Sequence, residues 1–182
     1  MVVQRMGGNR SIARATSPMR GGLRLRREQP LPAGVTVRQL QRSDTLALGH
    51  LMVVAYSGTF DDRGQTRSFH ESEAARTIAG EYGAVQWDAS LVAEAPEGEV
   101  IGATVVTHDR GHLLLAFALV APAWRNLGLG TALIVRSGNR LVAAGLSEWT
   151  LAVTTGNPAR QLYERLGFHV DQALASSRPD AP

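Results

Sequence analysis

Two glycines, Gly128 and Gly130, follow the apolar stretch 113–120 and open a segment with helical spacing of its apolar residues. Because glycine lacks a Cβ and adopts positive φ angles readily, several backbone N–H groups at this turn can point at one anion. The positive end of the helix dipole adds to that attraction, and a phosphate group is the ligand we expect. A tight turn from a strand into a helix would need the same glycines, so the spacing alone leaves both interpretations open.

Tyr163 is the second residue whose type and position suggest chemistry. It lies in a short segment with a favoured helix start at Asn157 and Pro158 and a favoured stop at Gly167. Because Tyr163 borders the apolar face of that helix, its ring can be buried while its hydroxyl reaches a cleft. The hydroxyl could act as a catalytic acid, or it could bond a backbone carbonyl as a core tyrosine.

The composition excludes several kinds of chemistry. The 182 residues contain no Cys, which rules out disulfides, a thiol nucleophile and Cys-ligated metals, and is compatible with a cytoplasmic location. They contain no Lys either, so no side-chain amine can form a Schiff base and no Walker phosphate loop is present. His108 and His112 are separated by Asp-Arg-Gly, which predicts a turn between them, and we propose no metal site.

Residues 34–182 are predicted to form one mixed α/β domain around one sheet. The order is a strand, two helices, three strands, a helix, a strand, a helix and a strand. The predicted strands are 35–40, 90–95, 99–107, 113–120, 149–155 and a last one from 168; the helices are 46–55, 71–82, 127–144 and 158–166. No apolar run approaches the roughly 18 residues that span a bilayer, so we expect no membrane association.

Residues 1–33 differ from the rest of the chain in charge. They carry a formal charge of +6, all of it from arginine, whereas residues 34–182 carry −3. Paired glycines, several prolines and the lack of apolar periodicity predict a disordered tail, whose deletion should leave the fold nearly unchanged. A passive tail and a nucleic-acid contact through its arginines are the two interpretations that remain open.

The stretch VAPAWRNLGLGT at residues 120–131 resembles the acyl-CoA pyrophosphate loop of the GNAT superfamily of N-acyltransferases. A second match lies at the expected distance, NPA at residues 157–159 followed by LYERLGF at 162–168. The predicted element order also resembles the GNAT fold. That resemblance implies a central, mostly antiparallel sheet with a V-shaped splay between strands 113–120 and 149–155, flanked by about four helices.

The resemblance further implies roles for individual residues. Tyr163 would protonate the departing CoA thiolate, and acetyl-CoA would be the co-substrate, with no metal. The backbone of a strand edge would pair with the pantetheine arm, the glycine-containing loop would bind the pyrophosphate, and Asn157 would contact the arm. The cofactor-binding residues implied in this way are Ala118, Leu119, Val120, Arg125, Asn126, Leu127, Gly128, Leu129, Gly130, Thr131 and Asn157.

The sequence also departs from the family. Many members place a general base on the strand that corresponds to 113–120, where this chain has Leu114. Carboxylates and histidines elsewhere remain candidates for the base or for acceptor binding, or are solvated turn and edge residues: Glu94, Asp61, Asp62, His108, Asp109 and His112. The family usually has a further closing strand, for which residues 168–182 leave no room, so a partner subunit could cover an exposed edge in a homodimer.

These observations predict a cytoplasmic N-acetyltransferase that moves an acetyl group from acetyl-CoA to an amine by direct attack. The loop of residues 57–69 that would line the acceptor pocket carries both signs of charge, so small amines and protein amines both remain open. The alternative is a non-catalytic acyl-CoA-binding or nucleic-acid-associated module, which would explain the missing strand carboxylate and the arginine-rich N-terminus.

Overall fold

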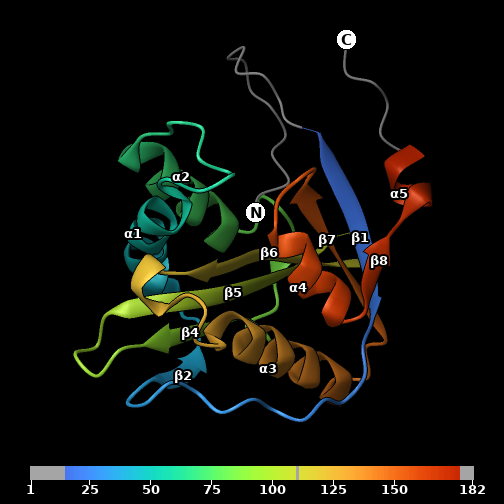
Figure 1. Ribbon diagram of the computed structural model, residues 1–182, viewed down its shortest axis with the longest axis horizontal. Coiled ribbons are helices and arrows are strands. Elements are labelled where there is room, and N and C mark those ends of the chain that lie inside the picture. The colour runs from blue at the N-terminus through green and yellow to red at the C-terminus, as the bar shows by residue number, and fades with distance from the viewer. Residues whose placement is uncertain (1–14, 110, 177–182) are drawn as a thin grey trace.

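The computed structural model describes residues 15–109 and 111–176, which form an eight-stranded sheet flanked by five α-helices (Figure 1). The strand order is β2-β4-β5-β6-β7-β1-β8, and β3 pairs with β5. The strands are β1 (Thr16–Gly22), β2 (Thr36–Gln39), β3 (Ala84–Val85), β4 (Leu91–Glu94), β5 (Val100–Asp109), β6 (His112–Val120), β7 (Glu148–Thr154) and β8 (Phe168–Val170). The helices are α1 (Thr45–Tyr56), α2 (Arg67–Ile78), α3 (Leu129–Ala143), α4 (Ala159–Arg165) and α5 (Gln172–Ser176).

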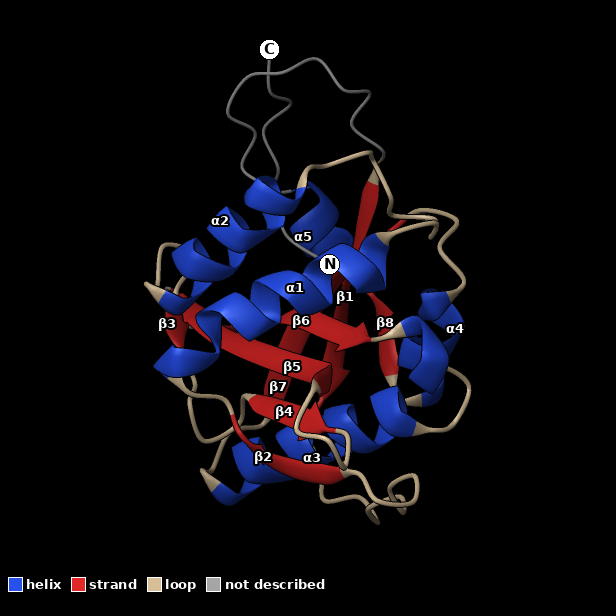
Figure 2. Ribbon diagram, turned by 90° about the vertical axis from the view of Figure 1, so that its left-hand side faces the viewer, coloured by secondary structure: helices blue, strands red, loops and turns tan. Residues whose placement is uncertain are grey.

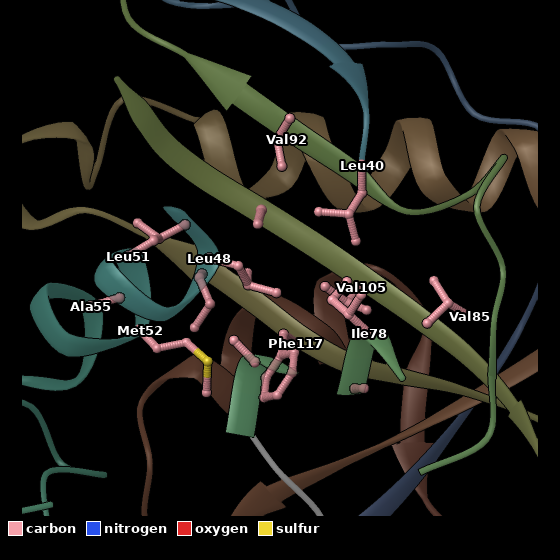
Figure 3. Close-up of a cluster of buried hydrophobic side chains, with 14 residues drawn as sticks. Leu40, Leu48, Leu51, Met52, Ala55, Ile78, Val85, Val92, Val105 and Phe117 are labelled. Carbon is pink, nitrogen blue, oxygen red and sulfur yellow. The ribbon is translucent and has the colours of Figure 1, made fainter. Parts of the chain in front are cut away.

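Helices cover both faces of the sheet. On one face, Leu48, Leu51 and Met52 of α1 pack with Val105 of β5 and Phe117 of β6 (Figure 3). Figure 2 shows α1 and α2 on this near side of β5 and β6. Buried residues of α3 fill the other face, so both faces of the central strands β5 and β6 are buried, as the continuous apolar sequence of β6 predicts.

The sheet opens between β6 and β7. These two strands are parallel and share one paired position, Leu114 with Thr150, whereas β6 pairs antiparallel with β5 along its whole length. Figure 1 shows β6 and β7 diverging beyond that point, with α4 beside the gap. The expected V-shaped splay in a mostly antiparallel sheet is therefore confirmed, and within the part of the chain that the structure describes it leaves one edge of β6 free from Leu115 onwards.

The prediction that residues 1–33 form a disordered tail is wrong where the structure describes them. Residues 16–22 form β1, which lies between β7 and β8 and pairs with both. Met19 is fully buried, and Arg20 forms ion pairs with Glu148 and Asp171. The N-terminal segment thus supplies one strand of the sheet, while residues 1–14 lie outside the described residues.

The local sequence of β1 does not predict a strand. Pro18 lacks an N–H to donate and is unusual in the interior of a sheet, and Gly21 and Gly22 are poor strand formers. Gly21 has a tertiary reason, because a Cβ there would lie 2.9 Å from the ring of Phe168. The glycine that marks a loop by propensity is needed for close packing of β1 on β8.

Most other elements begin and end within a few residues of their predicted bounds. Helix α2 begins at Arg67, four residues earlier than predicted, because the side chain of Thr66 accepts a hydrogen bond from the backbone N–H of Phe69. The short elements β3 and α5 were not predicted. Within residues 15–109 and 111–176, no helix is long and apolar enough to cross a membrane.

Candidate acyl-CoA and acceptor site

A cavity of about 710 Å³ lies where β6 and β7 separate. Its walls come from the strands β5, β6 and β7, the β6–α3 loop and the first half of α3, α4 with the residues before it, and the end of α1 with the α1–α2 loop. The sequence-predicted site residues that line it are Ala118, Leu119, Val120, Arg125, Asn126, Gly128, Leu129, Gly130, Thr131, Asn157 and Tyr163. Leu127 does not line the cavity, because its side chain points outward and is 55% exposed.

The loop before α3 has a backbone suited to an anion. Asn126 and Gly128 both have positive φ angles, 61° and 81°, and they flank Leu127. No side chain caps the N-terminus of α3, so the first N–H groups of the helix lack a capping partner. Alternation of left-handed and right-handed residues turns successive N–H groups toward one concave surface, which favours an anion such as phosphate.

The side chain of Arg125 stabilises this loop by bonding neighbouring backbone carbonyls. Its Nε donates to the carbonyl oxygen of Val120 at 3.3 Å, and its Nη2 donates to that of Ala55 at 2.8 Å. The guanidinium therefore joins the end of β6 to the last turn of α1, where a helix dipole favours a cation. We infer that the backbone of Arg125, and not its side chain, is available to a phosphate.

Tyr163 lies on α4 with its ring in the core and its hydroxyl at the cavity. The side chain is 9% exposed, and its ring meets that of Phe168 edge to face at 6.0 Å. Burial, followed by the negative charge of Asp61, raises the pKa of Tyr163 to about 12. Because of this raised pKa, the hydroxyl stays protonated at neutral pH. It bonds no other described residue, so it can donate to a ligand.

Asp61, Asn157 and Tyr56 meet at the part of the cavity bordered by α1 and the start of α4. Asn157 Nδ2 donates to Asp61 Oδ2 at 2.6 Å, and Asn157 Oδ1 accepts from the backbone N–H of Ala159 at 2.8 Å. Asn157 thus orients a carboxylate while it stabilises the start of α4, whose N-cap position is Pro158. The Tyr56 hydroxyl and Asp61 Oδ1 are buried and have no partner among the described residues.

Comparisons with known proteins identify this architecture. Residues 86–170 match the family model described as "Acetyltransferase (GNAT) domain". Over these residues, a little under half of the chain, the sequence is similar to a GNAT acetyltransferase domain. A comparison of the sequence with curated proteins found no match.

Solved structures share the GNAT fold at low sequence identity. A GCN5-related N-acetyltransferase from Sphaerobacter thermophilus has a TM-score of 0.67 and 21% identity, over 86% of this chain and 48% of that one. A tandem GNAT protein from the clavulanic acid biosynthesis pathway has a TM-score of 0.63 and 16% identity, over 88% of this chain and 51% of that one. PaiA N-acetyltransferase from Thermoplasma acidophilum, in complex with coenzyme A, has a TM-score of 0.60 and 17% identity, over 75% of this chain and 91% of that one. The chain therefore spans about half the length of the first two.

The fold does not bring Glu94 to the cavity. Arg38 donates to Glu94 Oε1 at 2.7 Å and also pairs with Asp44, so Glu94 belongs to an ion-pair cluster between β2 and β4. Glu94 is not among the residues that line the cavity. The suggestion that it accepts a proton from the amine is therefore not supported.

The remaining candidate bases also lie away from the cavity, with Asp61 as the exception. His108, Asp109 and His112 are exposed at the β5–β6 turn, and six residues of β6 put His112 about 20 Å from Ala118. Asp62 accepts hydrogen bonds from the backbone N–H groups of Gly64 and Gly58, which lower its pKa and shape the α1–α2 loop. Among the described residues, no group of His, Asp and Glu could hold a metal ion.

Sequence reasoning missed Tyr56. This residue ends α1, and its ring stacks on His70 of α2 at 5.5 Å. Burial raises its pKa, and the negative charges of Asp61, Tyr163 and Glu73 add to that effect. A tyrosine at the end of an apolar helix resembles a core residue, so the sequence held no signal that it borders a cavity.

Proposed function

We propose that this protein is an N-acetyltransferase that transfers the acetyl group of acetyl-CoA to an amine. The observation that supports the proposal is that one cavity is lined by the glycine-containing loop before α3, by the end of β6 that does not pair with β7, and by Tyr163. The loop would bind the pyrophosphate, and the free edge of β6 near Ala118 would pair with the amide groups of the pantetheine arm. The thioester would then lie in the opening between β6 and β7.

The transfer begins with attack of a neutral amine nitrogen on the thioester carbonyl carbon. A C–N bond forms, and the carbonyl oxygen takes the negative charge. When this tetrahedral intermediate collapses, the C–S bond breaks and the sulfur leaves as a thiolate. The attacking nitrogen loses one proton and the sulfur gains one, so the products are an N-acetylated amine and CoA with a free thiol.

Tyr163 would donate to the leaving sulfur. Its pKa of about 12 exceeds the reference pKa of a thiol, about 8.5, so full transfer of the proton to a free thiolate is uphill. A hydrogen bond that strengthens as charge develops on the sulfur is the contribution that these pKa values favour. Bulk water then replaces the proton of Tyr163 if it has been transferred.

A thermal-shift measurement with acetyl-CoA tests the proposed cofactor. A ligand that binds only the native state must raise the Tm, by mass action. Gly128→Val should abolish the shift, since its side chain would occupy the concave side of the loop at a φ of 81°. Gly98→Val is the matched control, because Gly98 also has a positive φ, 84°, with open space around it, but lies in the β4–β5 turn.

An acetyl-transfer screen over an amine panel tests the activity itself. Release of CoA can be followed with a thiol reagent without background from the protein, which has no Cys. Propionyl-CoA and succinyl-CoA in parallel decide whether acetyl is the preferred group. A thermal shift without release of CoA for any amine would instead favour a non-catalytic acyl-CoA-binding module, for which Leu114 on β6 is the supporting feature.

A further inference from the structure

One arginine side chain that lines the cavity has no partner within the part of the chain that the structure describes. The lining cations are Arg125 and Arg165. The Arg125 guanidinium donates to the backbone carbonyls of Val120 and Ala55, at 3.3 and 2.8 Å. Arg165 is exposed and forms no hydrogen bond or ion pair with any described residue. Its guanidinium is therefore the lining cation that remains available to an anionic ligand.

Arg165 belongs to the wall of the cavity that α4 forms. Pro158, Leu162 and Arg165 follow one another at intervals of four and three residues, so they share one side of the helix, and all three line the cavity. The glycine-containing loop and the first turn of α3 line it as well. Helices α3 and α4 lie on the same face of the sheet, where Ile134 and Leu162 pack in one hydrophobic cluster (Figure 1). One ligand in the cavity can therefore contact both walls.

Coenzyme A carries one phosphate group more than the loop before α3 would bind. It has a pyrophosphate on the 5′ carbon of its ribose and a further phosphate on the 3′ oxygen of the same sugar. The loop offers backbone N–H groups to the pyrophosphate. The 3′-phosphate is a monoester with about two negative charges at pH 7, and it lies one sugar ring away. A guanidinium binds such a group through two parallel N–H···O hydrogen bonds.

We propose that Arg165 binds the ribose 3′-phosphate of the acyl donor, and that the protein therefore takes its acyl group from free CoA and not from phosphopantetheine on a carrier protein. The inference rests on the proposed function, because it concerns the donor end of the same cavity. Phosphopantetheine lacks the adenosine of CoA and with it the 3′-phosphate. A thioester on a carrier protein would leave the Arg165 guanidinium without its ligand.

Calorimetric titration with CoA and with dephospho-CoA, which lacks only the 3′-phosphate, tests the contact. The wild type should bind CoA about 10-fold more tightly, because a charge-assisted hydrogen-bonded pair is lost with dephospho-CoA. In Arg165→Gln this preference should fall to about 2-fold or less, since the affinity for CoA drops and the affinity for dephospho-CoA stays. A preference in Arg165→Gln equal to that of the wild type, or an equal loss of affinity for both ligands, would overturn the assignment.

Arg160→Gln is the matched control, because it removes the same charge from the same helix at a residue that does not line the cavity. Arg160 pairs instead with Glu164 at 2.7 Å. This variant should keep the wild-type preference for CoA. A loss as large as that in Arg165→Gln would mean that the charge of α4 acts at a distance, and it would overturn the direct contact.

The choice between the two kinds of acyl donor is measured with acetyl-CoA and acetyl-phosphopantetheine. In the wild type we expect the KM for acetyl-phosphopantetheine to be at least about 10-fold higher, with a smaller change in kcat, because the missing contact is remote from the thioester. The ratio of the two KM values should shrink in Arg165→Gln and stay the same in Arg160→Gln. Equal KM values for both donors in the wild type would overturn the preference for free CoA.

The titrations need no acyl transfer, so they separate this inference from the proposed function. The expected preference for CoA, lost in Arg165→Gln, supports the 3′-phosphate contact even where no amine is acetylated, and failure of acetylation then counts against the transferase function alone. Equal affinity of the wild type for CoA and dephospho-CoA overturns the contact and leaves the transferase proposal standing. A wild type that binds neither ligand overturns both.

Discussion

Asn157 and Asp61 are 96 residues apart in the chain, and the side-chain amide of Asn157 donates to the Asp61 carboxylate across 2.6 Å. This bond joins the start of α4 to the α1–α2 loop. Six residues further along α4 lies Tyr163. The candidate acid Tyr163 and the Asp61 carboxylate are therefore positioned relative to each other through one hydrogen bond.

Asn157→Asp would replace that bond with two adjacent carboxylates. We expect the free energy of unfolding at pH 7 to fall by about 1–3 kcal/mol, since a charged hydrogen bond is lost. Repulsion raises the pKa of one carboxyl in the folded state, so the folded variant binds more protons and its deficit should shrink between pH 7 and 5. The double variant Asn157→Asp with Asp61→Asn restores an amide–carboxylate pair and should recover much of the loss. Chemical unfolding of the wild type, Asn157→Asp and the double variant at each pH measures these differences. A double variant that is as unstable as Asn157→Asp would contradict this account.

Tyr163→Phe should lower kcat by about 100-fold or more, the usual effect of removing a hydrogen-bond donor that stabilises charge in the transition state. The acetyl-CoA thermal shift should persist, because one hydroxyl is lost and the ring still packs on Phe168. Tyr82→Phe is the control: the Tyr82 hydroxyl bonds Glu73 at 2.9 Å and does not line the cavity. Full activity in Tyr163→Phe would assign Tyr163 a packing role only.

The wild-type rate should rise with pH as the acceptor amine itself deprotonates. The pKa of Tyr163, about 12, keeps its proton in place across that range. Acceptors of different basicity should therefore shift the rising limb of the pH–rate profile in parallel with their own pKa values. A limb at one fixed pKa for all acceptors would reveal an enzyme base instead.

Met19→Ala tests whether β1 belongs to the core. Met19 is fully buried in the hydrophobic cluster that β1 shares with β7 and β8, so the variant should lose about 2–5 kcal/mol of unfolding free energy. Leu25→Ala, in the same N-terminal segment, should change it by less than about 0.5 kcal/mol, because Leu25 is 72% exposed. Urea unfolding of both variants measures the difference, and equal losses would place β1 outside the cooperative unit.

His70 should make the fold sensitive to mild acid. Burial lowers the pKa of His70, so the unfolded chain binds a proton more readily than the folded one, and stability falls as pH drops below the unfolded value of about 6.5. The carboxylates with lowered pKa values, Asp44, Asp62 and Asp171, lose their stabilising effect only near pH 4 and below. Unfolding free energies at pH 7 and 5 should therefore differ less in His70→Gln than in wild type. His169→Gln, at an exposed position of β8, should keep the wild-type difference.

Local patterns in the sequence were sufficient for much of this protein. The glycines at 128 and 130 predict the turn before α3, and Gly128 does have a positive φ. The apolar run of β6, the short helix that carries Tyr163 and the order of the elements from β2 onwards, apart from β3 and α5, are confirmed. These features depend on residues within a few positions of one another, whose periodicity and cap preferences are visible in a single stretch of chain.

Tertiary structure alone decided the place of β1 and the partners of the charged residues. Pro18 and Gly21 oppose a strand by propensity, yet β1 forms because β7 and β8 offer it hydrogen bonds and Gly21 leaves room for the ring of Phe168. Glu94 and Asp61 are equally plausible bases in the sequence, but Arg38 pairs with Glu94, and the α1–α2 loop brings Asp61 to Asn157 and the cavity. No local pattern encodes such partners, because they are tens of residues apart in the chain and come together only when the whole domain has folded.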